Sequence, residues 1–185
     1  QLYAVTQPRM HLDVFAIADD MQQVYLEHGV TTCQDGATPA SMADALCALA
    51  DAGKLKLDVV SYPMHGEDVD AILASHADFD GPAYRRHLRI GGLKMFLDGS
   101  PQGLTAWMTE PYTSGPEGED DWVAYGTMTD EEAVAFAKKA IDGGHQLLCH
   151  TNGDAAGDQL LRVYAAALDA SDNPRKHELR PVMIH

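Results

Sequence analysis

The sequence has few cysteines, and their number and spacing exclude a disulfide scaffold. The three cysteines, Cys33, Cys47 and Cys149, are odd in number and lie far apart, which argues against paired disulfides and against a CxxC zinc site. A reducing compartment, the cytoplasm, is therefore the expected location.

Basic residues are also scarce, since 13 Lys and Arg stand against 28 Asp and Glu and the formal net charge is -15. A chain with this charge repels phosphate backbones and anionic lipid, so we expect no nucleic-acid partner. No apolar run approaches the roughly 20 residues that cross a bilayer, and the start of the chain lacks the basic and apolar regions of an export signal. We therefore expect no membrane association.

The sequence contains no internal repeat, no low-complexity tract and no GxGxxG or P-loop motif. Instead, apolar residues at helical spacing alternate with short apolar runs from residue 15 onward, which predicts a parallel sheet with helices packed against it. The expected strands cover residues 30–33, 55–62, 88–97, 146–150 and 181–185. The expected helices cover residues 17–28, 39–52, 67–76, 129–142 and 154–169.

This pattern fits an α/β fold, either an open doubly wound sheet or part of a (β/α)8 TIM-type barrel. The missing nucleotide motifs remove the usual reason to prefer the open sheet. Thr38 is expected to cap the second helix, whereas Thr129 and Glu132 form a capping-box pattern at the start of the fourth. Asp35–Gly36 is most simply a turn, and the pair Gly91–Gly92 inside the longest strand suggests a bulge or a close approach of another backbone.

Residues 98–126 form a long loop rich in glycine, proline, acidic and aromatic residues. Its length is typical of functional or mobile loops, such as a lid over an active site. Because the loop directly follows a candidate ligand strand, Gln102, Trp107 and Tyr112 are expected to bind the substrate. In the alternative interpretation, Trp107 and Tyr112 pack the loop against the sheet.

The strand that precedes this loop carries a lysine among apolar residues. Period-2 alternation places Leu93, Met95 and Leu97 on one face and Lys94, Phe96 and Asp98 on the other. A lysine inside a sheet is costly unless it is paired. Carboxylation by carbon dioxide would turn Lys94 into an anionic oxygen ligand able to bridge two metal ions. The simpler alternative is an ion pair with Asp98 or a side chain that reaches the mouth of the barrel.

Two histidines, His150 and His185, end apolar strands at the edge where α/β barrels hold their catalytic groups. Neutral imidazole at such positions suits zinc and neighbouring transition metals, although a lone strand-end histidine is commonly scaffolding. Asp154 is either a hydrogen-bond partner of a metal ligand, a role also open to Asp98, or an ordinary N-cap. The other seven histidines receive no role.

Four sequence motifs follow one another in a recognisable order: GVTTCQDG at 29–36, KMFLDGS at 94–100, HTNGDAA at 150–156 and the terminal IH at 184–185. Together they resemble the strand motifs of the amidohydrolase family 3 group, which includes N-substituted formamide deformylases. The resemblance extends from about residue 15 to the end of the chain. It implies a (β/α)8 barrel, of which the chain would supply about strands two to six, and metal-dependent hydrolysis of C–N bonds in small amide-type molecules.

In this resemblance, Lys94 is the carboxylated ligand on strand four, and His150 and His185 are the ligands on strands five and six. One or two divalent ions, zinc in the first instance, would activate a water molecule for hydrolysis. The chain has neither the His-x-His pair of strand one nor the strand-eight Asp that serves as general base. Residues 1–185 are thus expected to be an incomplete and inactive piece of a hydrolase barrel, with residues 98–126 over the site.

Two other functions stay open. Strands two to six would leave two unpaired sheet edges, so the chain could be a non-catalytic unit that self-associates, and a homo-oligomer is expected. Alternatively, Lys94 could act as an amine or Schiff-base nucleophile in a metal-free barrel lyase or isomerase.

Overall fold

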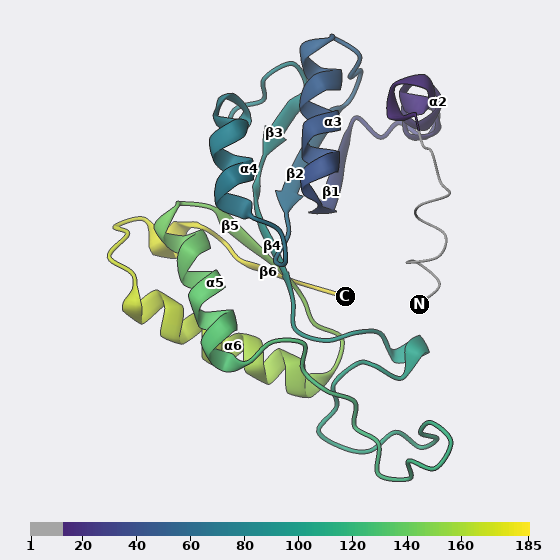
Figure 1. The fold of residues 1–185 in the computed structure, drawn as a ribbon, viewed down its shortest axis with the longest axis vertical. Coiled ribbons are helices and arrows are strands. Elements are labelled where there is room, and N and C mark those ends of the chain that lie inside the picture. Colours follow the sequence, from purple (N-terminus) through teal and green to yellow (C-terminus); the bar gives the residue numbers. More distant parts are fainter. Residues whose placement is uncertain (1–12) are drawn as a thin grey trace.

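The apolar periodicity of the sequence folds into alternating helices and strands in the computed structural model, which describes residues 13–185 (Figure 1). The helices are α2 (Val14–Glu27), α3 (Ala40–Asp51), α4 (Val69–Ser75), α5 (Asp130–Asp142) and α6 (Asp154–Ala170). The strands are β1 (Thr32–Thr38), β2 (Asp58–Pro63), β3 (Leu88–Ile90), β4 (Gly92–Phe96), β5 (Gln146–His150) and β6 (Val182–Ile184). Short 3-10 turns cover Ala77–Phe79, Pro101–Gly103 and Lys176–Glu178. In the described part of the chain, no helix is both long and apolar enough to cross a bilayer.

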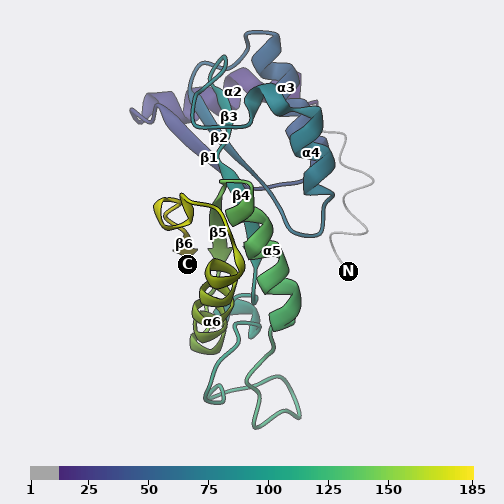
Figure 2. The ribbon, with the colours of Figure 1, turned by 90° about the vertical axis from the view of Figure 1, so that its left-hand side faces the viewer.

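These strands run parallel and form two three-stranded sheets, in the orders β1-β2-β3 and β4-β5-β6. Helices α2, α3 and α4 accompany the first sheet, and α5 and α6 lie side by side against the second (Figure 1, Figure 2). The two sheets meet just beyond β2, where Met64 bridges to Lys94 and the amide of His65 donates to the carbonyl of Lys94 at 2.7 Å. The predicted α/β class is therefore confirmed.

A pair of glycines divides residues 88–97, the longest expected strand, into β3 and β4. A Cβ on Gly91 would lie 2.3 Å from Val60 Cγ1, and a Cβ on Gly92 would lie 2.0 Å from the carbonyl oxygen of Gln146. Neither position leaves room for a side chain, so the close approach predicted from the glycine pair is confirmed. The prediction of one continuous strand is wrong, because here the chain leaves one sheet and joins the other.

The capping signals give one correct and one wrong prediction. Thr129 and Glu132 form the expected capping box at the start of α5, with both reciprocal hydrogen bonds present. Thr38 does not cap α3, because it ends β1 as a fully buried residue whose hydroxyl donates to the Asp35 carboxylate at 2.9 Å. Asp35–Gly36 also lies inside β1 rather than in a turn. Pairing with β2 extends the strand through residues whose local preference is a turn.

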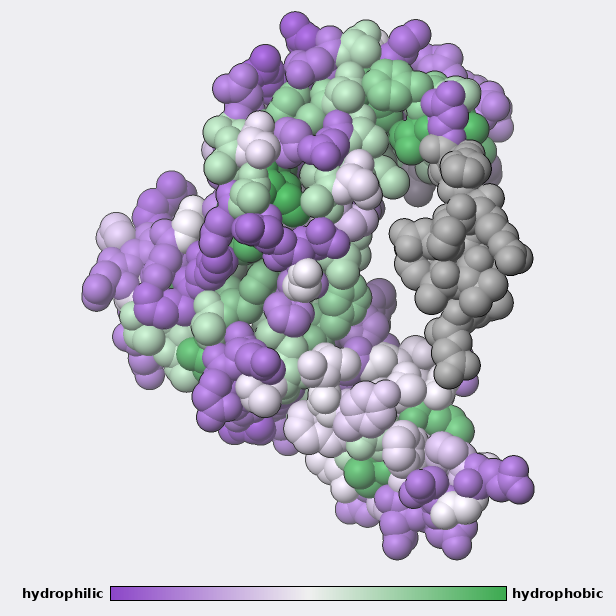
Figure 3. All heavy atoms as spheres, in the orientation of Figure 1, coloured by the Kyte–Doolittle hydropathy of each residue, from purple (hydrophilic) through white to green (hydrophobic). Residues whose placement is uncertain are grey.

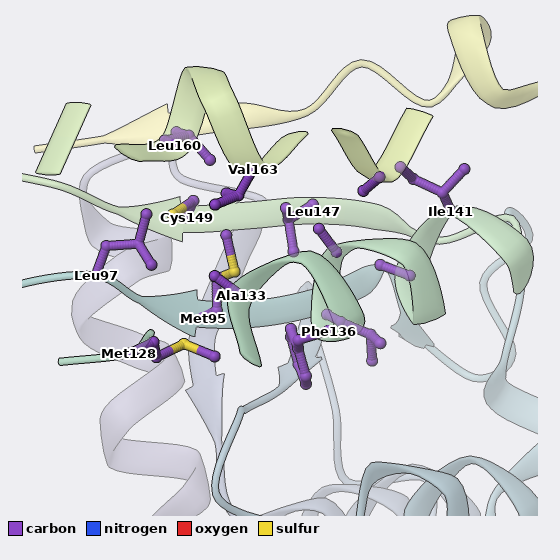
Figure 4. Close-up of a cluster of buried hydrophobic side chains, with 14 of the residues drawn as sticks. Met95, Leu97, Met128, Ala133, Phe136, Ile141, Leu147, Cys149, Leu160 and Val163 are labelled. Atoms are coloured by element: carbon purple, nitrogen blue, oxygen red, sulfur yellow. The ribbon is translucent and has the colours of Figure 1, made fainter. Parts of the chain in front are cut away.

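The alternation predicted for β4 is confirmed by its packing. Leu93, Met95 and Leu97 are fully buried in an apolar cluster between the second sheet and helices α5 and α6 (Figure 4). The cluster also contains Phe136, Ile141, Leu147, Cys149, Leu160 and Val163. Full burial of one such side chain contributes about 1.5–3 kcal/mol. Because one face of β4 and β5 is used in this way, Lys94 and His150 on the other face are free to form a site.

Candidate functional site

Lys94, His150 and His185 lie on or directly after three neighbouring strands of the second sheet. Because these strands are parallel, their carboxyl ends meet at one edge. The rings of His150 and His185 have their centres 4.7 Å apart, and the Phe96 ring lies 5.4 Å from that of His150. The Lys94 ammonium lies 4.6 Å from the centre of the Phe96 ring. The structure thus brings the three candidate ligands into one group, in which the Phe96 ring contacts both Lys94 and His150.

Lys94 is almost completely buried, with 2% of its surface exposed. Burial lowers the pKa of its ammonium group from 10.5 to about 8, and Cys149 acts in the opposite direction. Within residues 13–185 its charge is not paired with Asp98, which instead lies beside His150. The ion-pair alternative is therefore wrong, and Lys94 rests against the Phe96 ring. At mildly alkaline pH the side chain is partly a neutral amine, the form that reacts with carbon dioxide.

The His150 ring is held through its Nε2 atom. Nε2 lies 2.7 Å from the carbonyl oxygen of Gly99, which can only accept a hydrogen bond, so Nε2 carries the proton. The same atom lies 3.4 Å from Asp98 Oδ1 and 3.2 Å from Asn152 Nδ2. A neutral imidazole protonated at Nε2 keeps a lone pair on Nδ1, which is the atom left to bind a metal.

The surroundings of His185 favour its neutral form. Burial is the largest effect that lowers its pKa, and the charges of His150 and Lys94 lower it further, whereas Asp98 acts in the opposite direction. Neutral imidazole is the form that binds zinc and its neighbours. The second histidine of the group is therefore also suited to be a ligand.

Asp98, which was a candidate to support a ligand, contacts His150, and its side chain is fully buried. Its carboxylate accepts hydrogen bonds from the backbone amides of Trp107 at 3.0 Å, Asn152 at 2.9 Å and Gly153 at 2.7 Å. The first amide belongs to the long loop, and the other two belong to the turn between β5 and α6. One carboxylate thus joins the ends of two strands to the loop.

Asp154 contacts the long loop rather than the candidate ligands. It is the first residue of α6, whose N-cap is Gly153, so the interpretation of Asp154 as an N-cap is wrong. Its carboxylate accepts hydrogen bonds from the hydroxyl and the amide of Thr109, and these bonds lower its pKa. Asp154 therefore anchors the loop.

The three candidate substrate-binding residues have different surroundings in the loop. The Tyr112 hydroxyl donates to the carbonyl of Ala106 at 2.8 Å, and Trp107 packs against the apolar cluster of the second sheet. Gln102 is exposed. Trp107 and Tyr112 thus have the packing role named as the alternative, and substrate binding by the three residues stays a prediction.

Phe96 and Asn152 are not among the candidate residues predicted from the sequence. Phe96 contacts both Lys94 and His150, and Asn152 Nδ2 donates to the carbonyl of Gly99 at 2.7 Å, beside the His150 ring. The alternation of β4 places Phe96 on the face of Lys94, so this signal could have identified it. The contact of Asn152 depends on where the long loop meets β5, and no local pattern indicates it.

Residues 13–185 contain no group of three or more His, Cys, Asp or Glu side chains arranged to hold a metal. The group described above consists of two imidazoles and a lysine that becomes a ligand only after carboxylation. Such a set of nitrogen and oxygen donors fits zinc or a neighbouring divalent metal. Other residues of the full-length protein, or water, would fill the remaining coordination positions of the metal.

The comparison with protein families identifies the class to which this geometry belongs. Residues 12–185 match the model of a family described as the amidohydrolase family, and the chain belongs to that family. Over 102 residues it is 30% identical to Protein LONG AFTER FAR-RED 3 of Arabidopsis thaliana, a match that covers 54% of this chain and 16% of that protein.

Two solved structures are similar to the chain over most of its length. Both are described as uncharacterized metal-dependent hydrolases. The one from Pyrococcus horikoshii OT3 has a TM-score of 0.66 and 26% identity, and the match covers 88% of this chain and 34% of that one. The one from Pyrococcus furiosus has a TM-score of 0.71 and 25% identity, with coverage of 97% and 40%. The chain therefore spans less than half the length of either protein.

Proposed function

We propose that the full-length protein containing this chain is a metal-dependent hydrolase that cleaves C–N bonds in small amide-type molecules. The observation that carries the proposal is the convergence of buried Lys94 with His150 and His185 at the carboxyl ends of parallel strands. Family membership and the likeness to two metal-dependent hydrolases support it. The strands would form about strands two to six of a (β/α)8 barrel.

In this proposal, Lys94, His150 and His185 hold one or two divalent ions, zinc in the first instance. The neutral amine of Lys94 adds to carbon dioxide and releases a proton, and the product is a carbamate with anionic oxygens. The lowered pKa of Lys94 favours this reaction, because only the neutral amine has a free lone pair. Two imidazoles and an anionic oxygen are donors that zinc accepts.

A bound metal would lower the pKa of a water molecule toward ~7 and polarise the substrate carbonyl. The residues of this chain would orient the ligands and border the substrate, with Gln102, Trp107 and Tyr112 on the loop of residues 98–126. The general-base Asp of the family pattern is expected on a later strand, outside this chain. The 185-residue chain by itself is therefore expected to be inactive.

Metal analysis of the full-length protein tests the proposal. We expect stoichiometric divalent metal, with loss of both metal and amide hydrolysis in Lys94→Ala and in His150→Ala. Ser61→Ala is the matched control, because Ser61 is as buried as Lys94 but belongs to the other sheet, where its hydroxyl donates to Thr38 at 2.9 Å. An active full-length protein that contains no metal would contradict the proposal.

The lowered pKa of Lys94 also suits an amine nucleophile, so a metal-free lyase or isomerase is the chemical alternative. Borohydride reduction in the presence of a carbonyl substrate distinguishes the two mechanisms. It would fix the substrate covalently on Lys94 in a Schiff-base enzyme, whereas a carboxylated lysine has no free amine and should give no adduct.

A second candidate function is self-association of the chain, and a feature of the surface favours it. Helix α2 exposes Phe15, Met21, Val24 and Tyr25, and hydrophobic side chains gather where α2 lies, at the upper right of Figure 3. Strands β1 and β6 each have one unpaired edge among the described residues. Light scattering of the 185-residue chain is expected to show oligomers, and a well-folded monomer would count against this candidate.

A further inference from the structure

We infer that Asp98 is a positioning residue that couples the long loop to the imidazole of His150. The inference rests on the proposed function, because it concerns how a candidate metal ligand is oriented. Asp98 Oδ2 accepts from the amides of Trp107 at 3.0 Å and Gly153 at 2.7 Å. Oδ1 accepts from the amide of Asn152 at 2.9 Å and lies 3.4 Å from His150 Nε2.

Burial makes this set of hydrogen bonds interdependent. The Asp98 side chain is fully buried, and a buried carboxylate is costly unless donors satisfy both of its oxygens. Its donors come from the long loop and from the turn after β5, two segments that are separate in the sequence. If the loop segment at Trp107 moves away, Oδ2 loses a donor and the carboxylate is expected to shift from the position in which Oδ1 lies beside His150 Nε2–H.

The loop and the turn after β5 also touch directly. A Cβ on Gly153 would lie 1.7 Å from the carbonyl oxygen of Trp107 and 2.7 Å from its amide nitrogen. Only glycine allows the two backbones to come this close while both of their amides donate to Asp98. A change in the position of Trp107 therefore changes the hydrogen bonding of the same carboxylate that lies beside His150.

The chemical consequence concerns the nitrogen that would bind the metal. An anion beside Nε2–H stabilises the tautomer with the proton on Nε2, together with the Gly99 carbonyl at 2.7 Å, and makes Nδ1 a stronger donor. Loss of such an outer partner typically weakens metal affinity about 10–100-fold. We therefore expect the metal to be bound most tightly when the loop is seated on Asp98.

Cobalt substitution of the full-length protein measures the orientation of the ligands without relying on turnover. Asp98→Asn should weaken Co²⁺ binding about 10–100-fold and shift the visible absorption of the bound ion. The matched control is Asp130→Asn, because the Asp130 carboxylate on α5 accepts its hydrogen bonds from α6, from Gln159 Nε2 at 2.9 Å and from Arg162, rather than from the long loop. The control should leave the cobalt spectrum and affinity unchanged.

A second variant keeps the inference testable if Asp98→Asn does not fold. Gly153→Ala retains both Asp98 and His150 but pushes the backbone of Trp107 away, so it should shift the cobalt spectrum in the same direction. In the metal-free protein, hydrogen exchange at the amides of Trp107 and Gly153 should rise in either variant.

Three results would overturn the inference: a wild-type cobalt spectrum in Asp98→Asn, an equal shift in Asp130→Asn, or unchanged hydrogen exchange at Trp107 in the metal-free variants. A wild-type protein that binds no divalent metal would instead overturn the proposed function. The exchange measurement would then still decide whether Asp98 holds the loop.

Discussion

The two sheets are built alike, yet the carboxyl ends of their strands carry different chemistry. In the first sheet, Thr38 accepts a hydrogen bond from Ser61 and donates to Asp35, so the polar groups there satisfy one another. In the second sheet, Lys94 faces an aromatic ring, and His150 Nδ1 has no hydrogen-bond partner among residues 13–185. The two sheets therefore differ in which strand-end groups retain unused bonding capacity, and the fold alone does not decide this difference.

The largest effect is expected at the junction of the two sheets. Gly92→Ala would place a Cβ 2.0 Å from the carbonyl oxygen of Gln146, and we expect a loss of about 3 kcal/mol or more in unfolding free energy. Gly53→Ala is the control, because Gly53 has a positive φ of 66° but open space around it, and should cost about 1–2 kcal/mol. Urea unfolding measures both values, and equal losses would show that the junction is not tightly packed.

The lysine buried in the second sheet leads to a pH prediction. The pKa of Lys94 is about 8 in the folded protein, against an ordinary value of 10.5, so the folded state binds fewer protons between these limits. The metal-free protein should gain stability from this group as the pH rises from about 8 to 10.5, and the gain should be absent below pH 8. Lys94→Met removes the buried charge, so its advantage in Tm over the wild type should be greatest below pH 8 and shrink toward pH 10.5. An advantage that is constant with pH would contradict this account.

A smaller effect is expected in the first sheet. Ser61→Ala removes the hydroxyl that donates to Thr38, which should cost about 1–2 kcal/mol of unfolding free energy. Metal content should stay at the wild-type level, because the polar groups of this sheet bind one another. Loss of metal in Ser61→Ala would show that the polar groups of the first sheet also affect the candidate metal site.

The smallest effect is expected at the start of α5. Thr129→Ala removes the side-chain acceptor for the amide of Glu132, and thermal unfolding should show a loss of about 1 kcal/mol. Glu132→Gln keeps an acceptor for the amide of Thr129 and should be milder. A larger loss in Glu132→Gln than in Thr129→Ala would mean that the charge, not the cap, matters at this helix end.

Features that depend on residues close together in the sequence could be predicted from the sequence. The alternation in residues 93–98 separated the buried apolar face from the face with Lys94, because successive side chains of a strand point in opposite directions. The capping box of Thr129 and Glu132 was also predictable, because its two partners are only three residues apart in the sequence. The sequence alone also placed His150 and His185 at strand ends, and with them the candidate site.

Only the tertiary structure decided the features that depend on distant partners. It divided the predicted strand at Gly92, where the backbone of Gln146 leaves no room for a side chain, and it placed Thr38 in a strand because β2 pairs with β1. It also directed Asp98 to amides at Trp107 and Gly153 rather than to Lys94. A buried charge must be satisfied by hydrogen-bond donors that lie next to it in the folded chain. For Asp98, those donors include residues far away in the sequence, so only the tertiary structure identifies them.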